Sequence, residues 1–272
     1  MKTFKNYITQ DTKKPHKTND HNGFFIDKHG YANPSKPITI HKKIKKKEIK
    51  ENKINGLGVL PGIQGSSFSN HEDQLEELSD TLHSKQKKLT QKQIDHIKAY
   101  TNGNSIGGIE SRELNNKLIE NHKKSKYSTE GMSPKHKAIH ETISKLASQP
   151  IGHHVHLYSG VGFDPREAAE KSKNKIIHLP AHMSTSHDLY TATNFADMSA
   201  ERDVTPERHI IHIEAKPTDK GFHVGNHSEI PDEYETIIPA GTKLKYSHTT
   251  THTDGKTGPT YHVHHFTIHS QE

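Results

Sequence analysis

The chain of 272 residues contains no cysteine, and only 28% of its residues are hydrophobic. Without cysteine there is no disulfide bond, no thiolate nucleophile and no cysteine-based metal site. Hydrophobic residues and glycine together make up roughly 45–50% of an average globular chain. The low hydrophobic content therefore predicts that part of this chain contributes nothing to a core.

Long apolar runs are also missing. No stretch approaches the ~20 apolar residues of a membrane-spanning helix, and the N-terminal residues lack the apolar segment of a signal peptide. We therefore expect a soluble, monomeric protein of the cytoplasm that does not associate with a membrane. Delivery that needs no signal sequence is compatible with this expectation.

Positive charge is concentrated in the N-terminal part of the sequence. Residues 1–56 contain 14 lysines and five acidic residues, a balance of +9, whereas the whole chain has a formal charge of +6. The dense lysine run at residues 42–47 is typical either of a segment that contacts nucleic acid or of a solvated tail. Residues 1–75 show no sustained helical or alternating period, so we predict a basic, largely disordered segment there and a folded domain over residues 76–272.

Apolar periodicity predicts helices first and strands afterwards. Between residues 70 and 147 apolar residues recur at helical spacing, and Thr90 opens one segment with the spacing of a capping box. Later the pattern changes to short alternating segments, and Asp164-Pro165 has the residues that begin a helix. The predicted helices cover residues 70–82, 90–101, 110–122, 134–147, a segment from 165, and 189–196; the predicted strands cover residues 155–159, 176–179, 209–215, 235–238, 243–246 and 261–269. This order indicates an α+β fold rather than alternating βαβ units.

Two carboxylates stand close together near the end of the sequence. Glu233 and Glu235 lie where a loop enters an apolar run that Pro239 and Gly241 close. Side chains at i and i+2 share one face of a strand, so we expect both carboxylates to project into the same space. Such a pair can divide catalytic work, one stabilising a developing positive charge and the other handling a nucleophile's proton. The alternative is a hairpin edge whose acids are merely solvated.

Three stretches occur in an order that resembles a known family. They are Leu157-Tyr158-Ser159-Gly160, then Met183-Ser184-Thr185-Ser186 followed by Ala192, Phe195 and Ala196, then Glu233-Tyr234-Glu235-Thr236-Ile237-Ile238-Pro239 followed by Gly241-Thr242. Together with Leu89–Gln93, Ile97 and Tyr100-Thr101, they resemble the R-S-E class of mono-ADP-ribosyltransferases, found among bacterial toxins and T-even-type phage enzymes. The resemblance covers residues 88–272.

The resemblance implies an ADP-ribosyltransferase-like α+β fold, in which an N-terminal helical subdomain is followed by two packed, mainly antiparallel β-sheets around an NAD cleft. It implies an enzyme that cleaves the nicotinamide–ribose bond of NAD, its substrate, and passes ADP-ribose to a protein side chain with no metal required. In this family the E-x-E spacing is typical of enzymes that modify arginine, so the resemblance implies arginine as the acceptor. The implied partner is a host protein, from the transcription or translation machinery for a phage enzyme, with action in the host cytoplasm and carriage in the virion.

The resemblance also implies roles for individual residues. Glu235 would stabilise the oxocarbenium-like ribose through a hydroxyl group, Glu233 would orient and deprotonate the acceptor, and Ser184 would brace Glu235. The residues implied to bind NAD are Tyr158, Ser159, Gly160, Arg166, Thr185, Ser186, Phe195 and Arg202.

One position departs from the family pattern. The family has an arginine after the tyrosine of the first strand, where it binds the NAD phosphates, but this chain has Ser159. Arg166, at the start of the next predicted helix, is the first candidate to replace it because a helix N-terminus favours anions. Arg202 and Arg208 are further candidates. The departure leaves open a catalytically weak or silent relative, or a basic virion or nucleic-acid-associated protein acting through its lysine-rich tail.

Histidine is unusually frequent, at 26 residues. His262 and His264 share one face of a predicted strand, a spacing that binds zinc or nickel adventitiously. No third ligand has a fixed place in the sequence, so we expect exposed strand positions and no functional metal site. Apolar residues change face within the same strand, which predicts a bulge at His264–His265.

Overall fold

The computed structural model describes residues 25–26, 32–33, 68–84, 88–102, 109–125, 128–203, 207–253 and 259–269. The chain divides into two units, residues 1–55 and 56–272. The described residues of the first unit form two short antiparallel strands, β1 (Phe25–Ile26) and β2 (Ala32–Asn33). The lysine run at residues 42–47, and the nucleic-acid contact predicted for it, lie outside the described residues.

In the described part of the second unit, four helices precede the strands. They are α2 (Phe68–Ser84), α3 (Gln91–Thr101), α4 (Ile109–Ser125) and α5 (Pro134–Ala147). Thr90 and Gln93 form the predicted capping box of α3, and the Ser133 hydroxyl accepts a hydrogen bond from the backbone N–H of His136 at the start of α5. Of the helices in the described ranges, none is both long and apolar enough to cross a membrane.

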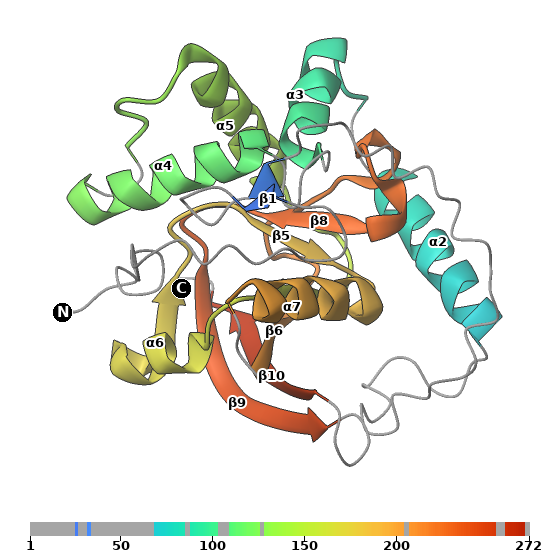
Figure 1. Ribbon diagram of the computed structural model, residues 1–272. Coiled ribbons are helices and arrows are strands. Elements are labelled where there is room, and N and C mark those ends of the chain that lie inside the picture. The colour runs from blue at the N-terminus through green and yellow to red at the C-terminus, as the bar shows by residue number, and fades with distance from the viewer. Residues whose placement is uncertain are drawn as a thin grey trace. The chain divides into compact units, whose positions relative to one another are not determined.

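The second half of this unit forms one eight-stranded sheet. Its strands are β3 (Val155–Val161), β4 (Ile176–His178), β5 (Met183–Ser186), β6 (Glu207–Ala215), β7 (Phe222–His223), β8 (Glu235–Ile238), β9 (Lys243–Thr253) and β10 (Thr260–Ile268). Their order is β4-β9-β10-β6-β3-β5-β8-β7, and every pair is antiparallel except β10 with β6. The α+β class is confirmed, with helices before strands along the chain (Figure 1).

The sheet is continuous, whereas two packed sheets were expected. Its five-stranded part runs from β4 to β3, and its three-stranded part contains β5, β8 and β7. The two parts meet through a single residue pair, Tyr158 of β3 with Ser186 of β5. Figure 1 shows β5 and β8 running in a different direction from β9 and β10. A junction of one residue pair allows this change of direction. The single hydrogen-bonded sheet therefore has two differently oriented parts in place of the two expected sheets.

Helices cover both faces of the five-stranded part. α6 (Pro165–Lys171) shares a core with Ile211, and α7 (Leu189–Asp203) shares another core with Ile210. Neighbouring residues of a strand point to opposite faces of the sheet, so α6 covers the face to which Ile211 points and α7 covers the face to which Ile210 points. Phe222 and Ile237 of the three-stranded part pack instead with α3, α4 and α5. The remaining elements are the 3₁₀ turns η1 (Lys173–Lys175), η2 (Gly225–His227) and η3 (Pro231–Glu233).

Several boundaries differ from the predicted ones. α7 extends to Asp203 and β9 to Thr253, both well past the predicted ends, and β7 was not predicted at all. The strand irregularity lies between His265 and Phe266, one residue later than predicted, and the extra residue is Ser247 of β9. The domain boundary predicted after residue 75 falls inside α2.

His264 is not the exposed strand residue that the sequence suggested. It shares one face of β10 with His262, as predicted, but it is only 1% exposed. Its ring lies against Thr249 of β9 and Asp164 at the start of α6. The expectation of exposure is wrong here because both faces of β10 are covered.

Removing residues 1–67 should leave the melting temperature of the second unit nearly unchanged, because the first helix among its described residues begins at Phe68. Removing residues 1–84 should lower it by at least about 5 °C, because Leu75 and Leu82 of α2 are buried and Ser79 is hydrogen-bonded to His223. Thermal unfolding followed by circular dichroism compares the two truncations. Equal melting temperatures would show that α2 does not contribute to the fold.

Buried histidines should make the fold sensitive to acid. Burial lowers the pKa of His182 and His187 to about 3 and that of His223 to about 4. Below pH ~6.5 the unfolded chain binds protons that the folded chain does not, so the free energy of unfolding decreases as the pH falls. Burial raises the pKa of Glu235 to about 7, which acts in the opposite direction between pH 7 and about 4.5. Burial also raises the pKa of Glu233, which acts in the same direction as Glu235, but the three histidines outweigh the two carboxylates.

The free energy of unfolding should fall by roughly 1.4 kcal/mol per pH unit for each additional proton that the unfolded chain binds relative to the folded chain. Urea unfolding at several pH values between 7.5 and 4.5 measures the slope, and a His182→Gln variant should have a shallower one. A free energy of unfolding that stays constant over this range would contradict the expectation.

Candidate active site

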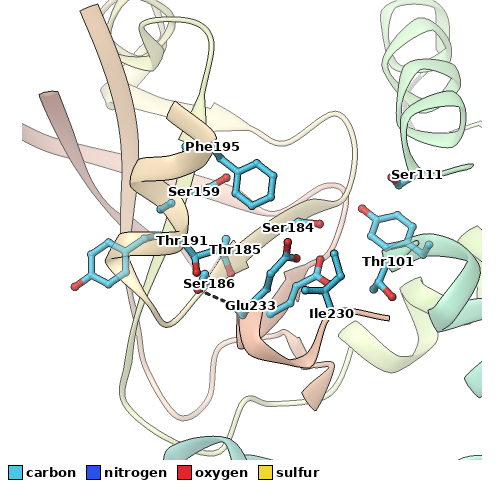
Figure 2. Close-up of a pocket in the computed structure, with 15 residues that line it drawn as sticks. Thr101, Ser111, Ser159, Ser184, Thr185, Ser186, Thr191, Phe195, Ile230 and Glu233 are labelled. Atoms are coloured by element: carbon cyan, nitrogen blue, oxygen red, sulfur yellow. Dashed lines mark hydrogen bonds between the residues drawn. The ribbon is translucent and has the colours of Figure 1, made fainter. Parts of the chain in front are cut away.

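One pocket brings together the three stretches that the sequence singled out. It has a volume of about 200 Å³ and includes the residue pair that joins β3 to β5. The side chains around it are shown in Figure 2. The residues that line it are Tyr100, Thr101, Ser111, Tyr158, Ser159, Gly160, Ser184, Thr185, Ser186, Thr191, Ala192, Phe195, Ile230, Glu233 and Glu235.

Glu235 is the buried acid of the pocket. It is the first residue of β8 and is 6% exposed. Burial raises the pKa of its carboxyl to about 7; a hydrogen bond with the Ser184 side chain acts against this rise, and the charge of Glu233 adds to it. At neutral pH the carboxyl group is therefore divided between its two protonation states. A nearby positive charge would favour the ionised form.

Glu233 reaches the same pocket from a turn rather than from a strand. It is the last residue of η3, and Tyr234 follows it in the left-handed conformation, with φ of 47°. The expectation that Glu233 and Glu235 lie on one strand face is therefore wrong in its geometry, although both side chains line the same space. Glu233 is half-buried, and burial raises the pKa of its carboxyl. The two carboxylates consequently have different environments.

Thr185 and Ser186 hold the backbone around the two acids. Thr185 Oγ1 donates a hydrogen bond to the Thr236 carbonyl oxygen at 2.6 Å. Ser186 Oγ donates to the Glu233 carbonyl oxygen at 2.7 Å (Figure 2). It also accepts a hydrogen bond from the Asp188 backbone N–H at 2.8 Å. Ser186 therefore ties η3 to the start of α7. These hydroxyls shape the pocket by fixing its backbone.

Six lining residues were not among the predicted site residues: Thr191 and Ala192 of α7, Ile230, and three residues from α3 and α4. Tyr100 and Thr101 end α3, and Ser111 lies in α4. The Tyr100 hydroxyl accepts a hydrogen bond from Asn115 at 3.2 Å, and burial together with the charge of Glu235 raises its pKa. Tyr100 thus remains a neutral hydrogen-bonding group beside the acid. Tyr100-Thr101 was part of the resemblance to the family, but its position in the sequence gave no sign that it would lie beside the two glutamates.

Gly160 lets α7 approach the floor of the pocket. A Cβ atom at this position would lie 2.2 Å from the Ala192 carbonyl oxygen and 2.4 Å from the Ala196 nitrogen. Both are backbone atoms of α7, so a side chain could fit only if the helix moved. The Asp188 side chain caps α7 by accepting hydrogen bonds from the backbone N–H groups of Tyr190 and Thr191. Cap and close approach together place α7 against the pocket.

Gly160→Ala should therefore displace α7, lower the melting temperature by several degrees and weaken NAD binding. Gly162→Ala is the matched control, because Gly162 is exposed and lies two residues further along. Thermal unfolding and an NAD titration compare both variants with the original protein. Gly160→Ala with unchanged melting temperature and NAD affinity would show that the close approach is not needed.

Neither Arg166 nor Arg208 lines this pocket. The described lining includes two glutamates but no lysine, arginine or histidine. The Arg166 guanidinium is bound to Asp164 at 2.8 Å, on the α6 face of the sheet, and Arg208 is bound to Asp197 at 2.8 Å. The side chain of Arg202 lies outside the described residues. Ser159 does line the pocket, so the identity of the phosphate-binding residue stays a prediction.

Known proteins resemble this chain in both sequence profile and fold. The family model for ADP-ribosyltransferase exoenzymes matches residues 78–264. Plx2a, an ADP-ribosyltransferase toxin from Paenibacillus larvae, is 17% identical with a TM-score of 0.52, over 74% of this chain and 96% of that chain. The C3 exoenzyme of Clostridium limosum is 14% identical with a TM-score of 0.55, over 73% and 95%. The Vis toxin of Vibrio splendidus is 13% identical with a TM-score of 0.52, over 77% and 89%.

No curated protein matches the chain in sequence. The solved structures, at these identities, establish a shared fold. The family model goes further, because its match begins in α2, ends in β10 and spans every element that lines the pocket. The chain therefore belongs to the ADP-ribosyltransferase exoenzyme family.

Proposed function

We propose that this family member cleaves NAD in the pocket and transfers ADP-ribose to arginine side chains of proteins. NAD-dependent mono-ADP-ribosylation is the activity that the family supports. The observation that carries the finer proposal is the pairing of the buried Glu235 with the half-buried Glu233 in one pocket. The two carboxylates supply different chemistry for the two halves of the reaction.

Glu235 serves the first half. The C1′–nitrogen bond of NAD breaks, nicotinamide leaves as a neutral molecule, and the ribose gains oxocarbenium character. An ionised carboxylate beside this centre stabilises its positive charge. The nicotinamide ring of bound NAD is itself cationic, which favours the ionised form of a group whose pKa is about 7. Ser184 orients the carboxylate through its hydrogen bond.

Glu233 serves the second half. A guanidinium has a pKa above ~12 and is a poor nucleophile until it loses a proton. Glu233 accepts that proton while the guanidine nitrogen bonds to the ribose C1′. Burial raises the pKa of Glu233, which makes it a stronger base than an exposed glutamate. The Vis enzyme, similar in fold, has been crystallised with agmatine, a guanidinium compound.

NAD fits the polar character of the pocket near the glutamates. Hydroxyl groups of Ser184 and Tyr100 lie beside Glu235, and Phe195 offers an aromatic surface. A structural neighbour, the BECa toxin of C. perfringens, has been crystallised with NADH. The reaction as proposed uses no metal ion. Arg166 lies on the α6 face of the sheet, opposite α7 and this pocket, so the pocket gives no support to its role in binding the phosphates.

The proposed acceptor is a host protein, with the transcription and translation machinery as the first to test and the host cytoplasm as the place of action. The carboxylate pair supports a guanidinium as the acceptor group, and it does not favour one host protein over another. Incubation of host lysate with labelled NAD, followed by peptide mapping, identifies both the protein and the modified side chain.

Two measurements test the activity itself. Purified protein should release nicotinamide from NAD and should transfer labelled ADP-ribose to agmatine. Nicotinamide release without transfer would retain NAD cleavage and exclude arginine as the acceptor. Neither product, in a protein that folds and binds NAD, would favour the catalytically silent relative. Binding of nucleic acid that disappears when residues 1–67 are removed would instead support the lysine-rich tail as the active part.

A further inference from the structure

A second cluster of reactive side chains lies on the α6 face of the sheet, away from the glutamates. Asp164 caps α6, His209 lies on β6 and His264 lies on β10. The parallel pairing of β6 with β10 sets His264 opposite Ile211, so the two histidines are diagonal neighbours on one face. Three elements that are far apart in the chain thus converge at one point.

The distances in this cluster suit a single small cation. Nδ1 of His209 and Nε2 of His264 are 3.1 Å apart, and Oδ1 of Asp164 is 3.7 Å from Nε2 of His264. One ligand atom from each residue can be chosen so that all three lie within 4.8 Å of one another. Two ligands at ~2.0–2.1 Å from a tetrahedral zinc ion are separated by about 3.3 Å. The side chains would need little movement to bind an ion.

A neighbour of the His264 ring orients it for this purpose. Nδ1 of His264 is hydrogen-bonded to Oγ1 of Thr249 at 2.9 Å, and Nε2 of His209 lies 3.8 Å from a Glu207 carboxylate oxygen. Thr249 can hold the Nδ1–H of His264, as the partners of metal-binding histidines do, whereas 3.8 Å is too long for a hydrogen bond from His209 to Glu207. The nitrogens left over are the two that face one another.

Two ring lone pairs facing each other at 3.1 Å repel unless a proton or a cation lies between them. A proton shared between the two rings would explain their contact, but it would not explain why the Asp164 carboxylate lies beside them. We propose that Asp164, His209 and His264 bind one divalent transition-metal ion of the zinc type, with a solvent molecule as the fourth ligand.

The charges and burial around the cluster agree with this assignment. His209 and His264 are 8% and 1% exposed, and a neutral imidazole is the form that binds metals. Arg166 contacts both oxygens of Asp164, through its guanidinium to Oδ2 and through its backbone N–H to Oδ1, each at 2.8 Å, so an ion would use the second lone pair of Oδ1, which lies 3.7 Å from Nε2 of His264. The Asp164 charge and the Glu207 carboxylate offset part of the charge of a divalent ion.

A metal here would act on the fold and not on NAD. It would link β6, β10 and the start of α6, on the opposite side of the sheet from α7 and the pocket. An ion that binds only the folded state raises the ratio of folded to unfolded protein about 100-fold when its free concentration is 100 times its Kd. The measurable consequence is a melting temperature that depends on zinc.

The test uses the full chain, purified without an oligohistidine tag and treated with EDTA. Cobalt(II) is titrated while its visible absorption is followed, because a tetrahedral site gives intense bands, and zinc binding is measured by displacement of cobalt. Asp164→Asn and His264→Gln are the test variants. Asparagine caps a helix as well as aspartate does, so Asp164→Asn removes the charge but keeps the start of α6. His265→Gln is the matched control, since His265 points to the other face and bonds to His212.

We expect one tetrahedral cobalt per chain, and a melting temperature raised by zinc, in the original protein and in His265→Gln. Both effects should be lost in Asp164→Asn and His264→Gln while their EDTA-treated forms still unfold cooperatively. Zinc binding of equal stoichiometry and affinity in all four proteins would place the ion among other histidines and overturn the proposal. Absence of tetrahedral cobalt in the original protein would overturn it as well.

Discussion

Glu235→Gln is expected to abolish both release of nicotinamide from NAD and transfer of ADP-ribose. Both reactions pass through the same oxocarbenium-like centre, and glutamine cannot supply the negative charge that stabilises it. Loss of one electrostatic stabiliser commonly costs a factor of about 10²–10³ in rate, and a charged group beside a cationic centre should cost at least that. Nicotinamide release, measured by chromatography at saturating NAD, gives the factor directly.

The same substitution should make the fold more stable at pH 8. The raised pKa of Glu235 means that burial disfavours its ionised form in the folded protein, and glutamine removes that charge from a buried site. We therefore expect a melting temperature at least equal to that of the original protein, together with lost activity. Asp232→Asn is the control, because Asp232 is exposed in η3 and does not line the pocket. Nicotinamide release by Glu235→Gln at the original rate would refute the catalytic assignment.

Glu233→Gln should lose transfer to agmatine while it keeps much of the slower hydrolysis of NAD. Water as the acceptor does not depend on a base that deprotonates a guanidinium, whereas the arginine side chain does. The half-buried position of Glu233 on η3, outside β8, separates it from the ribose-stabilising role of Glu235. We expect the ratio of transfer to hydrolysis to fall by about 10²-fold, within the range that a general base contributes.

The two rates are measured in the same reaction, by labelled ADP-ribose on agmatine and by free ADP-ribose. Asp232→Asn again serves as control, since it removes a neighbouring negative charge from the same turn. Equal loss of both rates in Glu233→Gln would assign the two glutamates to one shared step. An unchanged ratio would remove Glu233 from acceptor chemistry.

Local sequence signals correctly predicted where two of the helices begin. Thr90 and Asp164 each satisfy backbone groups within three residues of themselves, so the capping residue and its spacing determine the structure. The seven residues of β9 from Ser247 to Thr253 carry no apolar residue, and no periodicity could show that they form a strand. They are held by β10, whose His264 and His265 bond to Thr249 and Thr250. Such partners are visible only in the folded molecule.

The sequence placed the two glutamates in the same space, but the strand geometry it predicted for them differs from the structure. The E-x-E spacing identified the two acids, but alternation along a strand does not bring them together; a left-handed Tyr234 does. No sequence rule predicts that conformation for a tyrosine, because it is costly and depends on the surrounding contacts. The close approach at Gly160 was hidden for the same reason, since it is set by where α7 packs.

The place of β10 in the sheet has a consequence for how the protein reaches its native state. β10 follows every other strand along the chain, yet it lies between β9 and β6, and Val263 and Phe266 fill the cores on its two faces. Until it docks, β6 exposes an unpaired edge and both cores stay open. Contacts between residues so distant in sequence form slowly. We therefore expect the hairpin of β9 and β10 to insert last, in a slow step during which aggregation competes with folding.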